Sequence, residues 1–297
     1  MNSEGVEKQN MEADVNEAAS KIQSSQGKDN SKKKIALLVQ YVGTNYGGWQ
    51  KQDNAPTVQG ELEKALTRLC KEPIRLQGCS RTDAGVHARF HISHFVSTTT
   101  MPIDKIHIAM NTILPGDITV MDAKVVDMSF NARFDTIGKK YSYYIWNNTH
   151  KSAFLTPYSI QESRDLDLAA MREAATYLEG EHDFQGFMSQ GSPVNSTIRE
   201  LFEVKVHGEK GQMIRIDVKG NAFLYNMVRI IAGTLLYVGL GKINAKDIPE
   251  IILSGKRELA GKTLAAKGLF LEEVYYDNEI FNEWYNGEQN LVEYLGI

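Results

Sequence analysis

Hydrophobic positions along residues 35–126 switch between the two-residue period of strands and the 3.6-residue period of helices. Residues 35–39 (Ile-Ala-Leu-Leu-Val) form an almost unbroken apolar run, which predicts a buried central strand. Thr57 directly precedes apolar positions at helical spacing and can cap a helix there. In chain order, we predict strands over 35–39, 74–76, 89–96 and 118–126, with helices over 58–69 and 103–114.

Residues 141–275 repeat this alternation less regularly. Here we predict strands over 141–146, 198–206, 213–218 and 269–275, helices over 166–178 and 223–238, and a short helix near 248–253. Both halves therefore show the order of strands and helices of a ferredoxin-like unit. The predicted fold class is α+β, with two such α/β units whose antiparallel sheets join edge to edge.

The same patterns divide the chain into four segments. Residues 1–33 form a polar extension with few apolar residues, which cannot offset the entropy of ordering and is predicted to be disordered. Residues 34–138 form an N-terminal α/β domain, and residues 139–276 form a C-terminal one. Residues 277–297 are an acidic tail, whose few apolar residues predict that part of it docks on the body.

Composition favours a globular protein in a reducing compartment. Hydrophobic residues make up 42% of the 297 residues, yet no apolar run approaches the length of a membrane span. The polar N-terminus does not resemble a secretory signal peptide. Only two cysteines occur, Cys70 and Cys79, so we expect neither a disulfide framework nor a zinc site. A cytoplasmic location is the default expectation for such a chain.

Charge is distributed unevenly along the chain. The total formal charge is −4, with −3 on residues 1–31 and −5 on residues 277–297, which leaves +4 on residues 32–276. The body is therefore mildly basic between two acidic ends. This distribution permits phosphate binding but is equally compatible with an ordinary solvated surface.

One carboxylate lies in a turn between two predicted strands. Residues 78–88 (Gly-Cys-Ser-Arg-Thr-Asp-Ala-Gly-Val-His-Ala) contain Asp83, with Arg81 two positions earlier and Gly85 two positions later. Turns on a rigid sheet often carry reactive groups, and Gly85 permits a positive φ. Taken alone, an Asp in a turn is better explained by hydrogen bonds to its own backbone.

The string Arg-Thr-Asp-Ala-Gly-Val-His-Ala at 81–88 resembles the signature of the TruA-type tRNA pseudouridine synthases. Further blocks resemble that family in the same order and together cover roughly residues 35–276. These blocks lie at 43–50 (Gly-Thr-Asn-Tyr-Gly-Gly-Trp-Gln), 57–63, 130–134 (Phe-Asn-Ala-Arg-Phe), 139–143 (Lys-Lys-Tyr-Ser-Tyr), 180–184 (Gly-Glu-His-Asp-Phe) and 221–229.

The resemblance implies an enzyme that isomerises uridine to pseudouridine in a cleft between the two units, without metal or other cofactor. It places Asp83 as the catalytic carboxylate, paired with Arg229 on the apolar helical segment, and Tyr141 as the active-site tyrosine that stacks on the flipped uracil. Arg81 matches the residue that fills the space left by the flipped base. Asp83 can act by attacking the sugar or by removing a sugar proton, and the sequence leaves both routes open. Either route needs Asp83 ionised.

The resemblance also implies partners. Family members form homodimers that hold tRNA and modify its anticodon stem-loop, at uridines 38, 39 and 40. Basic side chains suited to contact phosphates include Arg133, Lys139 and Lys140. Tyr225-Asn226 departs from the bacterial pattern, which commonly has two histidines there, and this departure leaves the exact target uridines open.

Three other interpretations remain. His87, His91 and His94 lie near Asp83 and could suggest a metal site, but a strand would place His94 on the other face from the first two. A two-carboxylate glycosidase would need a second acid, for which Asp183 is the only candidate in a motif. A module that binds and folds tRNA without modifying it would need none of the catalytic residues.

Overall fold

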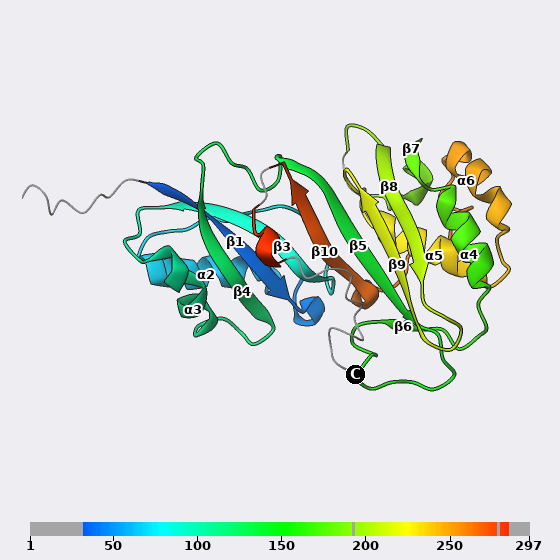
Figure 1. The fold of residues 1–297 in the computed structure, drawn as a ribbon, viewed down its shortest axis with the longest axis horizontal. Helices are drawn as coiled ribbons and strands as arrows, with labels where there is room; N and C mark the ends of the chain where they lie inside the picture. The colour runs from blue at the N-terminus through cyan, green and yellow to red at the C-terminus, as the bar shows by residue number, and fades with distance from the viewer. Residues whose placement is uncertain (1–31, 192–193, 278–279, 285–297) are drawn as a thin grey trace, which may run out of the picture.

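The structure is a computed structural model that describes residues 32–191, 194–277 and 280–284. Within these residues, ten strands form a single sheet, whose main path runs β4-β1-β3-β10-β5-β9-β8-β7. Figure 1 shows this sheet extending along the long axis of the molecule, with β4 near one end and β7 near the other. Most of the predicted N-terminal extension and of the C-terminal tail lies outside the described residues.

The N-terminal part of the sheet has the strand order of a ferredoxin-like unit. Strand β1 (Lys33–Tyr41) pairs antiparallel with β4 (Ile118–Val126) on one side and with β3 (His87–Ser97) on the other. The short β2 (Gln77–Gly78) pairs antiparallel with β3. The resulting order, β4-β1-β3-β2, is the one expected from the sequence.

The C-terminal part repeats this order on a larger scale. Strand β5 (Thr136–Trp146) lies between β10 (Leu269–Tyr276) and β9 (Met213–Gly220), and β9 pairs with β8 (Ile198–His207). All three of these pairings are antiparallel. Two short strands complete the sheet, namely β6 (Ile160–Gln161) beside β5 and β7 (Gly180–Asp183) beside β8.

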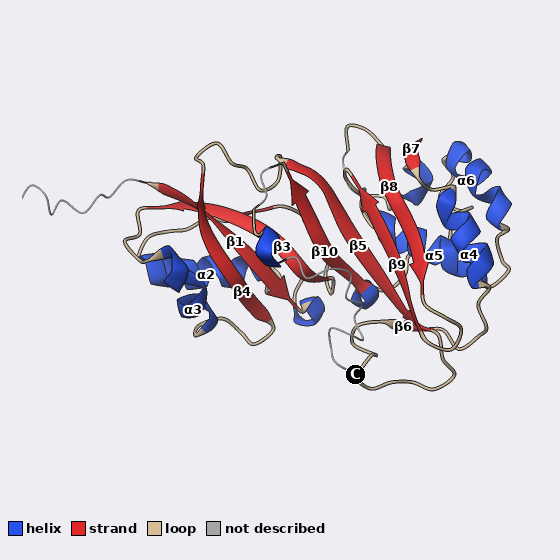
Figure 2. Cartoon of the chain, in the orientation of Figure 1, coloured by secondary structure: helices blue, strands red, loops and turns tan. Residues whose placement is uncertain are grey.

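The helices lie in two groups, one with each part of the sheet (Figure 2). Helix α2 (Val58–Cys70) starts at Thr57, whose hydroxyl accepts a hydrogen bond from the backbone N–H of Gly60, as the sequence predicts. The other helices are α3 (Ile103–Asn111), α4 (Leu168–Thr176), α5 (Met227–Gly239) and α6 (Ile248–Ser254), with 3₁₀ turns η1 (Gly43–Asn45), η2 (Gln185–Phe187), η3 (Ala245–Asp247), η4 (Ala266–Gly268) and η5 (Asn282–Trp284). None of the described helices has the length and apolar character that crossing a bilayer requires.

The two units are joined where β10 meets β3, so the predicted edge-to-edge arrangement is confirmed. Because β2 covers only the far end of β3, at Ser93 and His94, the near end of β3 is free to pair with another strand. Strand β10 takes this place in parallel orientation, through His87 and Ala88. The last strand of the C-terminal unit therefore pairs directly after the turn that carries Asp83.

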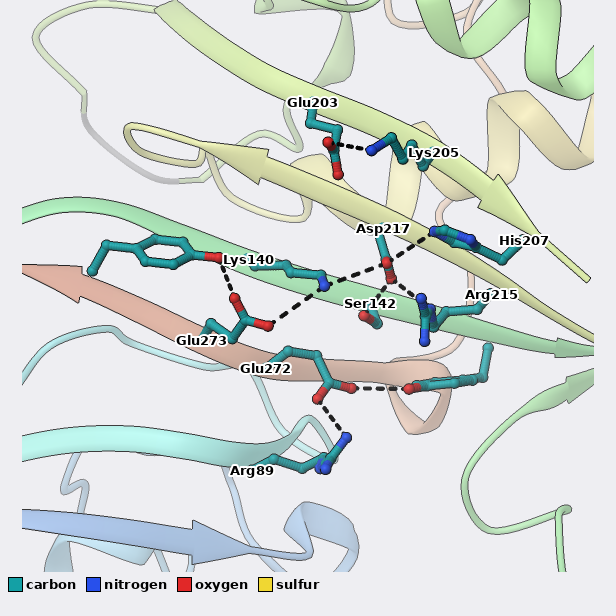
Figure 3. Close-up of polar contacts among 12 residues, drawn as sticks. Arg89, Lys140, Ser142, Glu203, Lys205, His207, Arg215, Asp217, Glu272 and Glu273 are labelled. Atoms are coloured by element: carbon teal, nitrogen blue, oxygen red, sulfur yellow. Dashed lines mark hydrogen bonds and ion pairs between the residues drawn. The ribbon is translucent and has the colours of Figure 1, made fainter. Parts of the chain in front are cut away.

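An ion pair spans this joint on one face of the sheet. Arg89 of β3 pairs with Glu272 of β10 at 3.1 Å, and Glu272 accepts a 3.0 Å hydrogen bond from the hydroxyl of Tyr144 on β5 (Figure 3). The Glu272 side chain is only 8% exposed. A buried carboxylate needs such partners to offset its desolvation, and this one takes them from strands of both units.

Two boundaries differ from the sequence prediction for identifiable reasons. The strand expected at 74–76 is absent there because side chains of α2 capture its backbone: Thr67 accepts from the N–H of Ile74, and Glu63 accepts from that of Leu76. Helix α5 begins at Met227 rather than at 223, because Asn226 has a φ of +62° and interrupts the helical backbone.

The described end of the C-terminal tail docks on the body of the protein. Phe281 is fully buried, and Trp284 donates a 3.0 Å hydrogen bond to Asp122 on β4. Lys124, also on β4, pairs with Glu283. Residues 280–284 therefore cover part of the N-terminal unit.

Candidate active site

A cleft of about 630 Å³ lies between the two units. The Asp83 turn of the N-terminal unit forms one wall, and residues 221–228 before and within the start of α5 form another. Strand β5 contributes Lys139 and Tyr141. Among the described residues that line the cleft, Asp83 is the only carboxylate.

The loop at 43–50 holds the Asp83 turn in place. The N–H of Trp49 donates to the carbonyl oxygen of Thr82 at 3.1 Å, and the N–H of Gly85 donates to the carbonyl oxygen of Tyr46 at 3.3 Å. Gly48 has a φ of +105°, and a Cβ there would lie 2.4 Å from the Thr82 carbonyl oxygen. Any side chain at Gly48 would therefore push the turn away, which explains why this position is a glycine.

Buried aromatic and imidazole rings also pack against the same turn. Trp49 is 2% exposed and stacks on His91 at 3.6 Å between ring centroids, so this tryptophan belongs to the core. His91 Nε2 donates to the carbonyl oxygen of Ser80 at 3.1 Å. Burial lowers the pKa of His91 to about 3, so this ring stays neutral and acts as a fixed donor.

The other two histidines also serve the backbone. His87 Nδ1 accepts from the N–H of Gly43 at 3.1 Å, while its Nε2 donates to the carbonyl oxygen of Lys267 at 3.2 Å. His94 Nδ1 accepts from the N–H of Ala132 at 3.1 Å. The described residues contain no group of three side chains arranged to hold a metal ion. Their hydrogen bonds to the backbone give these histidines a structural role.

Asp83 and Arg229 meet across the cleft. The distance from Arg229 Nη1 to Asp83 Oδ2 is 3.3 Å. Two further bonds fix the guanidinium: Nε donates to the carbonyl oxygen of Leu264 at 2.7 Å, and Nη1 also donates to Asn226 Oδ1 at 2.6 Å. Arg229 is thus oriented by the C-terminal unit toward a carboxylate of the N-terminal unit.

Two opposing effects act on the acidity of Asp83. Burial raises the pKa of this carboxyl above its ordinary value, and the charge and hydrogen bond of Arg229 act in the opposite direction. The net direction is upward. The guanidinium is therefore the group that favours the ionised form, which any role as nucleophile or base requires.

Tyr141 lines the cleft beside this pair. Its side chain is 6% exposed, and its hydroxyl is hydrogen-bonded to Ser80 Oγ at 2.9 Å. Phe223 packs edge-on against its ring at 5.1 Å. Burial raises the pKa of Tyr141, so the phenol keeps its proton.

The predicted RNA-contacting residues do not all reach the cleft. Arg81, Arg133 and Lys139 line it, and burial lowers the pKa of Lys139. Lys140 does not line the cleft, because successive side chains of a strand point to opposite faces of the sheet. Its Nζ lies 3.5 Å from both Asp217 and Glu273 within a buried network on the other face of the sheet (Figure 3). Lys140 was expected to bind substrate; in the structure its ammonium group pairs with two carboxylates and its side chain does not line this cleft.

Asp183 also lies away from Asp83. It belongs to β7, the last strand on the sheet path, and its carboxylate accepts a 3.0 Å hydrogen bond from the N–H of Gln185. The second carboxylate that a glycosidase needs is therefore not among the described residues of the cleft.

Sequence reasoning missed two contributors to the site. Asn226 appeared only as a departure from the bacterial pattern, although it accepts from Arg229 and donates to Ser189 Oγ at 3.0 Å. Phe134 ends a block that carries the resemblance, and its ring borders the cleft with 73% of its surface exposed. The spacing of three between Asn226 and Arg229, which brings two residues together at a helix start, was the available signal for the first.

Comparisons with known proteins show what the chain as a whole is similar to. A family model described as tRNA pseudouridine synthase matches residues 37–135 and 174–277. The tRNA pseudouridine synthase A of Ruminiclostridium cellulolyticum is 48% identical over 82% of this chain and all of its own length. That of Acetivibrio thermocellus is 45% identical over 82% of this chain and 99% of its own. A solved archaeal box H/ACA sRNP Nop10–Cbf5 complex covers 78% of this chain and 61% of its own at 10% identity, with a TM-score of 0.32, which is too weak to carry an argument.

Proposed function

Because this chain belongs to the tRNA pseudouridine synthase family, and is thus an isomerase acting on tRNA, we propose that Asp83 is its catalytic carboxylate. The observation that supports this assignment most strongly is the isolation of Asp83. It is the only carboxylate among the described residues of the cleft, and it faces Arg229 at 3.3 Å.

The reaction breaks the bond between N1 of uracil and C1′ of ribose and forms a bond between C5 and C1′. The proton on C5 is lost and N1 gains one, so the atoms balance without a co-substrate. The carboxylate of Asp83 can attack C1′, or it can remove a proton from the sugar, and both routes start from the ionised form. Arg229 supports ionisation in either case.

Tyr141 and Arg81 complete the proposed site. The ring of Tyr141 would stack on the extruded uracil, while its protonated hydroxyl stays bound to Ser80. Arg81 is exposed at the rim of the cleft and, in the described part of the chain, its side chain makes no hydrogen bond or ion pair. It is therefore free to occupy the space that the uridine leaves in the RNA helix.

We further propose that the target uridines lie in the anticodon stem-loop, at positions 38, 39 and 40 of tRNA, and that a cytoplasmic homodimer carries out the reaction. The resemblance of the motif blocks supports both proposals. Arg133, Lys139 and Arg199 border the cleft and can contact phosphates on either side of the extruded nucleotide. Neither a metal ion nor an organic cofactor is required by this chemistry.

The test is to compare the wild-type enzyme with Asp83→Asn and Asp83→Ala on unmodified tRNA. Both variants are expected to lose pseudouridine formation while binding tRNA within about twofold of wild type, because the phosphate contacts lie elsewhere. Chemical mapping of the product shows which uridines react, and tRNAs with single changes at 38, 39 or 40 define the targets. Normal product from Asp83→Ala would refute the assignment of Asp83. Product at other uridines would refute the assignment of the anticodon arm.

A further inference from the structure

Phe134 is a phenyl ring displayed at the rim of the cleft. It is 73% exposed and belongs to the residues that line the cleft around Asp83. A single exposed apolar side chain needs no explanation by itself. What distinguishes Phe134 is the way its backbone is held and the charge around its ring.

The backbone of Phe134 is fixed by a compact turn. Asn131 Oδ1 accepts from the N–H groups of both Arg133 and Phe134, at 3.0 and 3.2 Å. Two further hydrogen bonds close the turn. The N–H of Asn131 donates to the carboxylate of Asp135 at 2.7 Å, and the N–H of Asp135 donates to the carbonyl oxygen of Asn131 at 3.0 Å. The ring is therefore presented from a rigid turn and not from a loose loop.

The same turn is anchored to strands of both units. The N–H of Ala132 donates to His94 of β3, and its carbonyl oxygen accepts a 2.6 Å hydrogen bond from Tyr276 of β10. Because β3 and β10 meet beside the Asp83 turn, the position of Phe134 is set relative to the proposed catalytic carboxylate. A preorganised aromatic ring binds a flat ligand at little cost in entropy.

The charge around the ring indicates what kind of ligand it suits. The guanidinium carbon of Arg133 lies 5.6 Å from the centroid of the Phe134 ring, and Arg81, Lys139 and Arg199 border the same cleft. Aromatic rings interleaved with cations at a groove are the usual means of binding bases and phosphates of single-stranded nucleic acid. An apolar peptide would leave these cations without partners.

We propose that Phe134 and Arg133 form a stacking subsite for a second base of the tRNA, one that flanks the uridine entering the cleft. This inference rests on the proposed function. The base stacks on Phe134, and Arg133 neutralises the phosphate beside it. The subsite holds the RNA in register while Asp83 acts on the neighbouring nucleotide.

The experiment measures equilibrium binding of tRNA by Phe134→Ala, Phe134→Tyr and a matched control, Phe154→Ala. Phe154 is 76% exposed but does not border the cleft. We expect Phe134→Ala to bind on the order of tenfold more weakly, which is typical for loss of one stacked base, with Phe134→Tyr and Phe154→Ala near wild type. Equal binding by Phe134→Ala and Phe154→Ala would overturn the proposal.

A second measurement identifies the base. Anticodon stem-loops that carry an abasic nucleotide at each position flanking the target are bound to wild type and Phe134→Ala. At one abasic position, Phe134→Ala should bind the RNA as tightly as wild type does, because the base that stacks on Phe134 is already missing. A penalty that persists at every position would overturn the stacking role. Both binding measurements are made with Asp83→Asn added to every protein, which prevents conversion of the bound RNA. The result is therefore separate from a failure of the wild-type enzyme to form pseudouridine, which would refute the proposed function instead.

Discussion

Asn226 and Arg229 lie one turn apart at the start of α5, and a single guanidinium nitrogen of Arg229 donates both to Asn226 at 2.6 Å and to Asp83 at 3.3 Å. The shorter bond is the one to the neutral amide. Asn226 in turn donates to Ser189 at 3.0 Å. The orientation of the arginine toward Asp83 is therefore set by an amide that, among the described contacts, makes no hydrogen bond to the carboxylate itself, and Asn226 is a positioning residue.

Asn226 can be tested through the pH dependence of the reaction. Asp and Gly both tolerate the φ of +62° at this position. Asn226→Gly should lower the single-turnover rate by about tenfold, the typical effect of one lost hydrogen bond to a charged group. Asn226→Asp adds a carboxylate that competes for Arg229 and raises the pKa of Asp83, so the acid limb of the rate profile should move to higher pH. If both variants keep the wild-type profile, Asn226 does not act through Arg229.

Asp83 should cost the folded protein stability at neutral pH. Its pKa is raised in the folded state, so the folded protein holds this proton more tightly than the unfolded chain does. The free energy of unfolding therefore falls as pH rises from the unfolded pKa to the folded one. The free energy of unfolding of Asp83→Asn does not contain this pH-dependent decrease. The variant should therefore become more stable than wild type as pH rises through that window. Urea unfolding at several pH values checks the sign, and an advantage confined to low pH would contradict it.

Lys139 and Lys140 should respond differently to the same change. Lys139→Glu should weaken tRNA binding and reduce the slope of log affinity against log salt by about one, because Lys139 lines the cleft. Lys140→Glu should instead lower the free energy of unfolding by about 3 kcal/mol or more, because it places a third carboxylate beside Asp217 and Glu273. Salt titrations and thermal unfolding of both variants separate the two roles. A stable Lys140→Glu protein with weak tRNA binding would instead identify Lys140 as an RNA contact.

Arg81→Ala should leave initial tRNA binding nearly unchanged and slow the reaction by about tenfold or more. Extruding a paired uridine costs a few kcal/mol, and Arg81 is proposed to offset part of this cost by filling the vacancy. A substrate whose target uridine is already unpaired should restore much of the rate. Single-turnover kinetics on paired and unpaired targets decide the matter, since equal slowing on both means that Arg81 has another role.

Local patterns predicted most of the fold because each half buries elements with clear periods. Strand β4 occupies the predicted residues 118–126, and the Thr57 cap forms as expected. The two-residue period of β5 also predicts that only one of Lys139 and Lys140 can face the cleft. Since Tyr141 was expected in the cleft, the same alternation places Lys139 on its face and Lys140 on the opposite one.

Other features depend on contacts between distant residues. The sequence at Ile74 and Leu76 has strand character, but Thr67 and Glu63 of α2 accept the hydrogen bonds of these two backbone N–H groups. The pairing of Arg229 with Asp83 joins positions 146 residues apart, and only the resemblance pointed to it. The role of Asn226 depends on the fixed direction of that arginine, which no local pattern records.

The place of β10 in the sheet bears on the order in which the protein matures on the ribosome. Among the described strands, β10 is the last to leave the exit tunnel, yet it fills the edge of β3 directly beside the Asp83 turn. Until residues 269–276 emerge, the nascent N-terminal half carries an unpaired edge at His87 and Ala88. A chain released before this point could fold its first unit and still lack the joint that brings Arg229 to Asp83. Residues 269–276 must therefore be synthesised before the two halves can form one active site.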